Sequence, residues 1–226
     1  MGGVKVAVRV RPFNQREIDR EAKLCIDMDG AKTTIENLDD GGSRNFTFDY
    51  SFWSHDGFET KDDGLMVPTS SKYNDQVFVF NVLGKEILDN AWEGYHCCLF
   101  AYGQTGSGKS YSMIGYGVNK GIVPMACAEI FNRIGDNTDS NVTFEVNFSM
   151  LEIYNEKVQD LLIPPNTRPS GGLKVRESKT MGVYVEGLSQ HPVDSYDAIE
   201  KKTDLGNKNR SIGSTLMNAT SSRAHT

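Results

Sequence analysis

The chain has 226 residues, of which 38% are hydrophobic and 24% are charged. This length suits one large domain or two small ones, and the composition excludes collagen-like, low-complexity and wholly disordered proteins. The 24 basic and 30 acidic residues give a net charge of -6, which argues against a chain that binds nucleic acid through its overall charge. The apolar runs are far shorter than the ~20 residues that a membrane-spanning helix needs, so no membrane span is expected.

The first fifty residues predict mainly strands. Valines alternate with other residues over positions 4–10, and the pattern stops at Arg11 and Pro12, which predicts a first strand. No signal-peptide pattern precedes this strand. The other features predicted here are edge strands at 25–26 and 33–35, a loop at 39–43 and a strand around 46–50.

A long helix and a short apolar strand are predicted next. Apolar residues recur every three or four positions over residues 75–92, which is typical of an amphipathic helix, and Gly94 ends the pattern. Residues 97–102 predict a short apolar strand, in which Cys97 and Cys98 are expected to be buried, reduced thiols.

The remainder of the chain alternates between helical and strand patterns. In order, we expect a glycine-rich turn at 103–108, a helix from about 109, a loop at 115–121, a helix at 122–134, the longest strand at 142–150, a loop at 164–172, a hairpin of 173–175 with 183–185, and a helix capped by Asp194 or Ser195. Such alternation predicts an α/β layered domain, and no linker divides the chain.

One segment carries most of the functional information. The run GQTGSGKS matches the phosphate-binding pattern GxxxxGK[ST] at every fixed position, and it consists of Gly103, Gln104, Thr105, Gly106, Ser107, Gly108, Lys109 and Ser110. Glycines let consecutive backbone N–H groups turn toward phosphate oxygens, the lysine supplies a positive charge to the β and γ phosphates, and the serine hydroxyl is a ligand for Mg²⁺. A chance glycine-rich turn is the alternative. The apolar strand before the run and the helix after it favour nucleotide binding.

Four ordered blocks resemble the motor domain of kinesins. They are VRVRP at 8–12, EGYHCCLFAYGQTGSGKS at 93–110, SMLEIYNEKVQDLL at 149–162 and NATSSRAH at 218–225, which is similar to the first switch of that family. Within the family, the segments 48–55, 109–113 and 173–177 look most like the vesicle-transporting kinesin-3 class.

The resemblance implies a fold and a domain boundary. It implies a P-loop NTPase of the α/β class, with three layers and a central, mostly parallel sheet flanked by helices. Residues 1–226 would be the N-terminal part of a single kinesin motor domain, ending after the first switch, with the C-terminal part missing. No DxxGxE second switch occurs in these residues, so the 226 residues alone are expected to be inactive, and their apolar strands to be incompletely covered.

The resemblance also assigns residues to the nucleotide base. Arg9, Arg11 and Pro12 would border the adenine, and Tyr111 would stack on it. The alternative is that the two arginines are solvated charges at a strand end and that Tyr111 packs into the core.

In the first switch, the resemblance assigns Asn218 to the phosphate region, and Ser221 and Ser222 to the γ-phosphate and Mg²⁺. Ser110 and Ser222 would be the metal ligands, and Arg223 would form an ion pair with the second switch. The sequence departs from the family pattern at three places. Ala224 replaces a serine of the switch, the polar Lys202 and Thr203 occupy positions that are usually apolar, and residues 180–183 replace a His-Pro and Gly-Pro pattern.

The function expected from this resemblance is an ATP-dependent microtubule motor. Its cofactors would be ATP or ADP and Mg²⁺, its partner the microtubule, and its location the cytoplasm and cytoskeleton. Cargo or an adaptor would bind through regions outside these residues. Two alternatives remain: a non-motile, nucleotide- or tubulin-binding kinesin-like protein or inactive fragment, and a different P-loop NTPase such as a GTPase.

Overall fold

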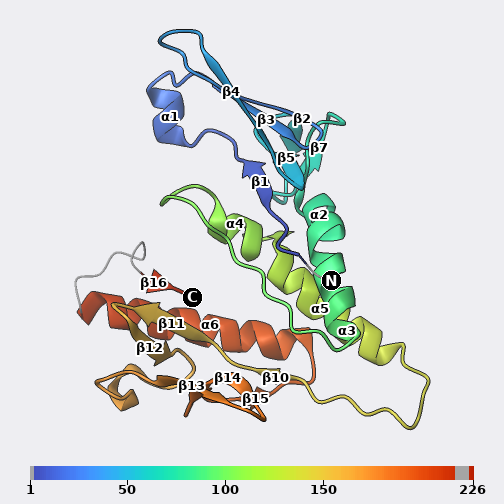
Figure 1. The fold of residues 1–226 in the computed structure, drawn as a ribbon, viewed down its shortest axis with the longest axis vertical. Coiled ribbons are helices and arrows are strands. Elements are labelled where there is room, and N and C mark those ends of the chain that lie inside the picture. The colour runs from blue at the N-terminus through green and yellow to red at the C-terminus, as the bar shows by residue number, and fades with distance from the viewer. Residues whose placement is uncertain (1–2, 217–223) are drawn as a thin grey trace. The chain divides into compact units, whose positions relative to one another are not determined.

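The computed structural model describes residues 3–216 and 224–226 of the chain (Figure 1). The chain divides into two units, Met1–Ala126 and Cys127–Thr226. Within the described residues every sheet has two or three strands, and β1 with β5 is the parallel pair. No helix of the described residues is long and apolar enough to cross a membrane.

The first unit contains short strands around one helical region. Its elements are β1 (Ala7–Val10), α1 (Gln15–Asp19), β2 (Ile26–Asp29), β3 (Lys32–Glu36), β4 (Ser43–Thr47), β5 (Tyr50–Trp53), β6 (Phe58–Thr60), β7 (Met66–Pro68), α2 (Gln76–Val79), the π-helical segment Phe80–Gly84, α3 (Lys85–Trp92), α4 (Lys109–Met113), β8 (Gly115–Tyr116) and β9 (Asn119–Lys120). Helix α5 (Ile122–Gly135) begins in this unit.

The core of the first unit forms where β5 meets the helical region. Phe52, Val79, Phe80 and Ile122 are buried and pack together. Burying each such side chain contributes about 1.5–3 kcal/mol. The predicted edge strands are confirmed as β2 and β3, whereas the single strand predicted around 46–50 is two strands, β4 and β5, separated by residues 48–49.

The predicted helix over residues 75–92 is confirmed as three consecutive helical segments. The Asp75 side chain caps its N-terminus by accepting a hydrogen bond from the backbone N–H of Phe78 at 2.7 Å. The middle segment is a π-helix, in which the Phe80 ring lies where a Cβ atom on Gly84 would stand. Gly94 follows the last turn with a φ of 91°, a left-handed conformation that ends the helix as predicted.

The second unit consists of antiparallel strands and one long helix. Its elements are β10 (Asn147–Phe148), β11 (Leu151–Tyr154), β12 (Lys157–Asp160), the 3₁₀ turn Pro165–Thr167, β13 (Lys174–Ser178), β14 (Gly182–Glu186), β15 (His191–Pro192), α6 (Tyr196–Leu216) and β16 (Ala224–His225). The hairpin β13–β14 and the helix α6 confirm two predictions. The Ser195 hydroxyl accepts a bond from the backbone N–H of Ala198 at 3.3 Å, which caps α6.

Two apolar segments differ from the sequence predictions. Residues 97–102 contain no strand, and of residues 142–150 only Asn147–Phe148 is one. A strand forms only when a neighbouring strand pairs with it, and no described strand pairs with residues 97–102. Cys97 and Cys98 are therefore exposed free thiols, so the prediction that both are buried is wrong for this structure. Residues 115–121, predicted as a loop, form the small hairpin β8–β9.

Candidate nucleotide-binding site

The backbone of residues 103–110 bends at its glycines. Gly108 has a φ of 96° and is the residue before α4, whose N-terminus receives no hydrogen bond from a capping side chain. A Cβ atom on Gly103 would lie 2.6 Å from the Ser107 hydroxyl oxygen, so a larger residue would disturb the loop. Because α4 has only five residues, the N–H groups of the loop must supply most of its attraction for anions.

Lys109 folds back over its own loop. Its ammonium group donates hydrogen bonds to the backbone carbonyls of Gly103 at 2.8 Å and Gln104 at 2.9 Å. The backbone N–H of Ser107 donates to the same Gln104 carbonyl at 3.1 Å. Both acceptors are neutral carbonyls. A charged phosphate oxygen forms a stronger hydrogen bond with an ammonium group, so a bound phosphate could replace them as the partner of Lys109. Ser110 is exposed at the start of α4.

Arg11 links the first strand region to this loop. Its Nε donates to the Gly106 carbonyl at 2.7 Å, and its Nη1 and Nη2 each donate to the Glu17 carboxylate at 2.7 Å. Its Nη1 also donates to the carbonyl of Pro12 at 2.6 Å. The hydrogen bond from Arg11 lowers the pKa of Glu17 from 4.5 to about 2. Arg11 therefore holds the middle of the loop while its own charge is balanced by Glu17.

Arg9 is partly buried and has only uncharged acceptors among its hydrogen-bond partners. Its Nε donates to the Ser54 hydroxyl at 2.9 Å, and its Nη1 donates to Gln76 Oε1 at 2.6 Å and to the Ser112 hydroxyl at 3.1 Å. Burial lowers the pKa of its guanidinium below the ordinary value. The guanidinium carbon lies 5.3 Å from the ring centre of Tyr111, a cation–π distance.

Tyr111 has partners on several sides. Besides the Arg9 contact, its ring centre lies 5.9 Å from that of Tyr116, and its hydroxyl donates to the Met66 sulfur at 3.4 Å. Burial raises the pKa of the Tyr111 phenol. The structure thus brings Arg9 and Tyr111 together beside the loop that begins α4. Arg9 and Tyr111 are both partly buried. They are less exposed than fully solvated side chains and more exposed than core residues.

The predicted switch residues Asn218, Ser221, Ser222 and Arg223 lie outside the described residues. Helix α6, which precedes them, accommodates the two polar departures noted in the sequence. The Lys202 ammonium lies 3.2 Å from His191 Nδ1, and the Thr203 hydroxyl donates to the Ile199 carbonyl at 2.9 Å. The backbone of Ala224 pairs with Tyr154 in the β11–β16 ladder.

Sequence reasoning missed two residues of this region. Glu17 could have been found, because Asn14 and Glu17 form the N-x-x-E capping box of α1, with bonds of 3.0 and 2.8 Å. Gln76 carried no such signal, since its partners are 35 to 67 residues away in the sequence.

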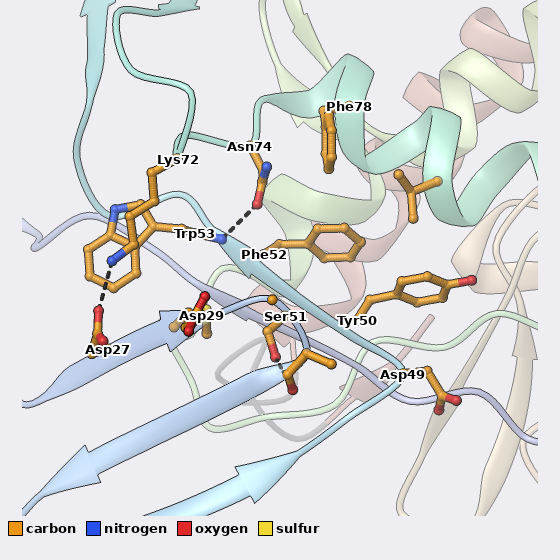
Figure 2. A pocket seen from close by; sticks show the side chains of 14 residues that line it. Asp27, Asp29, Asp49, Tyr50, Ser51, Phe52, Trp53, Lys72, Asn74 and Phe78 are labelled. Atoms are coloured by element: carbon orange, nitrogen blue, oxygen red, sulfur yellow. Dashed lines mark hydrogen bonds and ion pairs between the residues drawn. The ribbon is translucent and has the colours of Figure 1, made fainter.

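A separate cleft is lined by residues of β2, of β5 and of the segment 72–82, and it contains none of the predicted site residues. It has a volume of about 700 Å³, and Figure 2 shows its aromatic and acidic lining. The Lys72 ammonium lies 3.9 Å from the ring centre of Trp53 and 2.7 Å from the Asp27 carboxylate. These contacts give Lys72 a partner on both sides, so its positive charge is already balanced within the chain.

The glycine-rich loop of residues 103–108 matches the P-loop pattern in sequence, and the helix α4 follows it as that pattern requires. The kinesin motor domain family matches residues 9–226. The chain belongs to the kinesin motor domain family.

Individual relatives agree with this assignment. The chain is 50% identical over 225 residues to the kinesin-like protein KIF28 of Rattus norvegicus, covering 98% of this chain and 22% of that protein. It is 46% identical over 226 residues to KIF1A of the same species, covering 98% of this chain and 12% of that protein. These relatives are members of the kinesin-3 class, as the sequence predicted. The chain spans about a fifth of KIF28 and about an eighth of KIF1A.

Solved structures resemble the fold. A KIF14 motor dimer with AMP-PNP in complex with a microtubule matches with a TM-score of 0.81 and 40% identity, covering 92% of this chain and 55% of that chain. A KIF14 structure with ADP and a microtubule matches with a TM-score of 0.79 and 41% identity, covering 91% of this chain and 55% of that chain. The predicted fold class, a partial motor domain of the P-loop NTPase type, is confirmed.

Proposed function

We propose that this chain is part of an ATP-dependent microtubule motor, whose nucleotide lies on the loop Gly103 to Ser110. The observation that carries the proposal is the ammonium group of Lys109, held over the Gly103 and Gln104 carbonyls by exchangeable hydrogen bonds. The close approach of Gly103 to Ser107, where no Cβ fits, suits a loop that wraps closely around a polyphosphate.

Different residues would bind the phosphates, the adenine and the Mg²⁺ of the nucleotide. Lys109 and the N–H groups of residues 103–108 would bind phosphate oxygens, and Arg11 would keep the loop in place through Gly106. Pro12 and Tyr111 would contact the adenine, with Arg9 behind the Tyr111 ring. Ser110 and Ser222 would be ligands of Mg²⁺, which when bound neutralises charge on the β and γ phosphates. Asn218, Ser221 and Arg223 would belong to the switch that senses the γ-phosphate.

Microtubules are the proposed partner, because the KIF14 structures that resemble this chain were obtained in complex with a microtubule. A motor of this kind would act on the cytoskeleton in the cytoplasm, with cargo or adaptors bound by other parts of the protein. Nucleotide binding would change the affinity for the filament by reorganising the switch.

A GTPase is less well supported. The guanine-reading pattern NKxD does not occur in the sequence: NKGI at 119–122 and NKNR at 207–210 match its first two positions but lack the Asp, and NKNR lies within α6. In NKNR the position of the guanine-reading Asp is Arg210, a cation that cannot accept the hydrogen bonds of the base.

The test is phosphate release by the full-length protein with and without microtubules. We expect turnover that microtubules stimulate and that Lys109→Ala removes. A non-motile, nucleotide-binding protein, which the loss of a switch serine at Ala224 favours, would bind ATP yet show no stimulation. Stimulated turnover that survives Lys109→Ala would refute the assignment of the site.

A further inference from the structure

Gln76 is a buried amide whose polar atoms are all used. It is the first residue of α2, and it is 6% exposed. Its Oε1 accepts the 2.6 Å bond from Arg9, and its Nε2 donates to the Tyr111 carbonyl at 2.7 Å and toward the Asn119 carbonyl at 3.4 Å. A carboxamide has both an acceptor oxygen for the Arg9 donor and an N–H donor for the two carbonyls at this position.

These contacts hold Tyr111 in two ways. Gln76 binds the Tyr111 backbone directly, and it binds Arg9, whose guanidinium lies over the Tyr111 ring. Arg9 is further held by the Ser112 hydroxyl on the next residue of α4. The position of the ring beside the phosphate loop is therefore set by a chain of contacts from α2 through β1 to α4.

We propose that Gln76 is a positioning residue for recognition of the nucleotide base, acting through Arg9 and Tyr111. The inference rests on the proposed function, in which Tyr111 stacks on adenine. A ring that is held in place before the ligand arrives loses less conformational freedom on binding, so the stacking contact is stronger.

This role makes a prediction that a purely structural role does not. Gln76 touches neither Lys109 nor the loop carbonyls, so losing it should weaken binding of the base while leaving binding of the phosphates unchanged. Substitution of Gln76 should therefore weaken the binding of ATP, which carries adenine, but not the binding of tripolyphosphate, which has no base.

The experiment compares Mg·ATP with Mg·tripolyphosphate in equilibrium titrations of the full-length protein. Gln76→Met keeps the size of the side chain and removes both sets of hydrogen bonds. Gln76→Glu keeps the acceptor for Arg9 but turns a carboxylate toward two carbonyls. For both variants we expect the affinity for ATP to fall about five- to thirtyfold, the range of a weakened base stack. The affinity for tripolyphosphate should stay within about twofold, because the phosphate contacts are intact.

A double variant completes the test. Combining Gln76→Met with Tyr111→Ala should weaken ATP binding no more than Tyr111→Ala alone, since both changes remove the same contact.

Three results would overturn the inference. The first is an equal loss of affinity for ATP and for tripolyphosphate, which would show a general structural role. The second is unchanged affinity for both ligands, and the third is additive effects in the double variant. If the unsubstituted protein binds no ATP, the proposed function fails and the inference fails with it. ATP binding that Lys109→Ala abolishes but that the Gln76 variants leave intact overturns the inference alone.

Discussion

At the scale of single residues, the charge of Arg11 beside the phosphate loop is balanced by Glu17. The Glu17 carboxylate accepts hydrogen bonds from both Nη atoms of Arg11, and Arg11 Nε donates a hydrogen bond to the Gly106 carbonyl. The carboxylate therefore acts on the loop through the guanidinium. Its pKa of about 2, below the ordinary 4.5, shows that the folded state favours the charged form.

This pKa predicts how stability depends on pH. A lowered carboxyl pKa stabilises the fold above pH 4.5, and that contribution is lost as the pH falls from about 4.5 toward 2. We expect Glu17→Gln to lower the free energy of unfolding at pH 7, and we expect its effect to shrink as the pH falls and to vanish below pH 2, where Glu17 itself is protonated in both states. Urea denaturation of both proteins across this range measures the difference, and a difference that stays constant with pH would contradict the pairing.

Which residues meet at the site was only partly predictable from the sequence. The phosphate loop follows from a local pattern, and so does the Asn14–Glu17 capping box. By contrast, Arg9 donates hydrogen bonds to Ser54, Gln76 and Ser112, which are 45 to 103 residues away from it in the sequence. Their meeting is a consequence of tertiary packing, which no local pattern contains.

At the scale of elements, the helices were predicted better than the strands. The helix of residues 75–92 is set by local features: apolar spacing, the Asp75 cap and Gly94. A strand depends on a distant partner, and the apolar residues 97–102 lack one among the described residues.

The Asp75 cap gives a prediction for this helix. Asp75→Ala leaves the N–H of Phe78 without its 2.7 Å acceptor and should lower the free energy of unfolding by about 1 kcal/mol. Asp75→Asn keeps a side-chain oxygen and should cost much less. Denaturant titrations of the two variants distinguish them, and equal destabilisation would show that the charge matters rather than the cap.

At the scale of the whole molecule, the central question is which nucleotide the protein prefers. Tyr111 lies in α4 directly after the loop, and the sequence contains no NKxD pattern that would read guanine. We expect unlabelled ATP to displace labelled ATP from the full-length protein more effectively than GTP does. Equal competition by the two nucleotides would mean that Tyr111 and its neighbours do not select the base.

Of the residues in the proposed nucleotide site, we expect Lys109 to matter most for binding. Its described hydrogen bonds go to two loop carbonyls, so Lys109→Ala should leave the thermal unfolding midpoint nearly unchanged. Unfolding at an unchanged midpoint is then the control for binding.

The decisive measurement is isothermal titration of Mg·ATP into the full-length protein and into its Lys109→Ala variant. We expect saturable binding by the unsubstituted protein and the loss of high-affinity binding in the variant, because the ammonium group of Lys109 supplies positive charge to the phosphates. An unchanged dissociation constant in the variant would contradict the assignment of Gly103 to Ser110 as the nucleotide site.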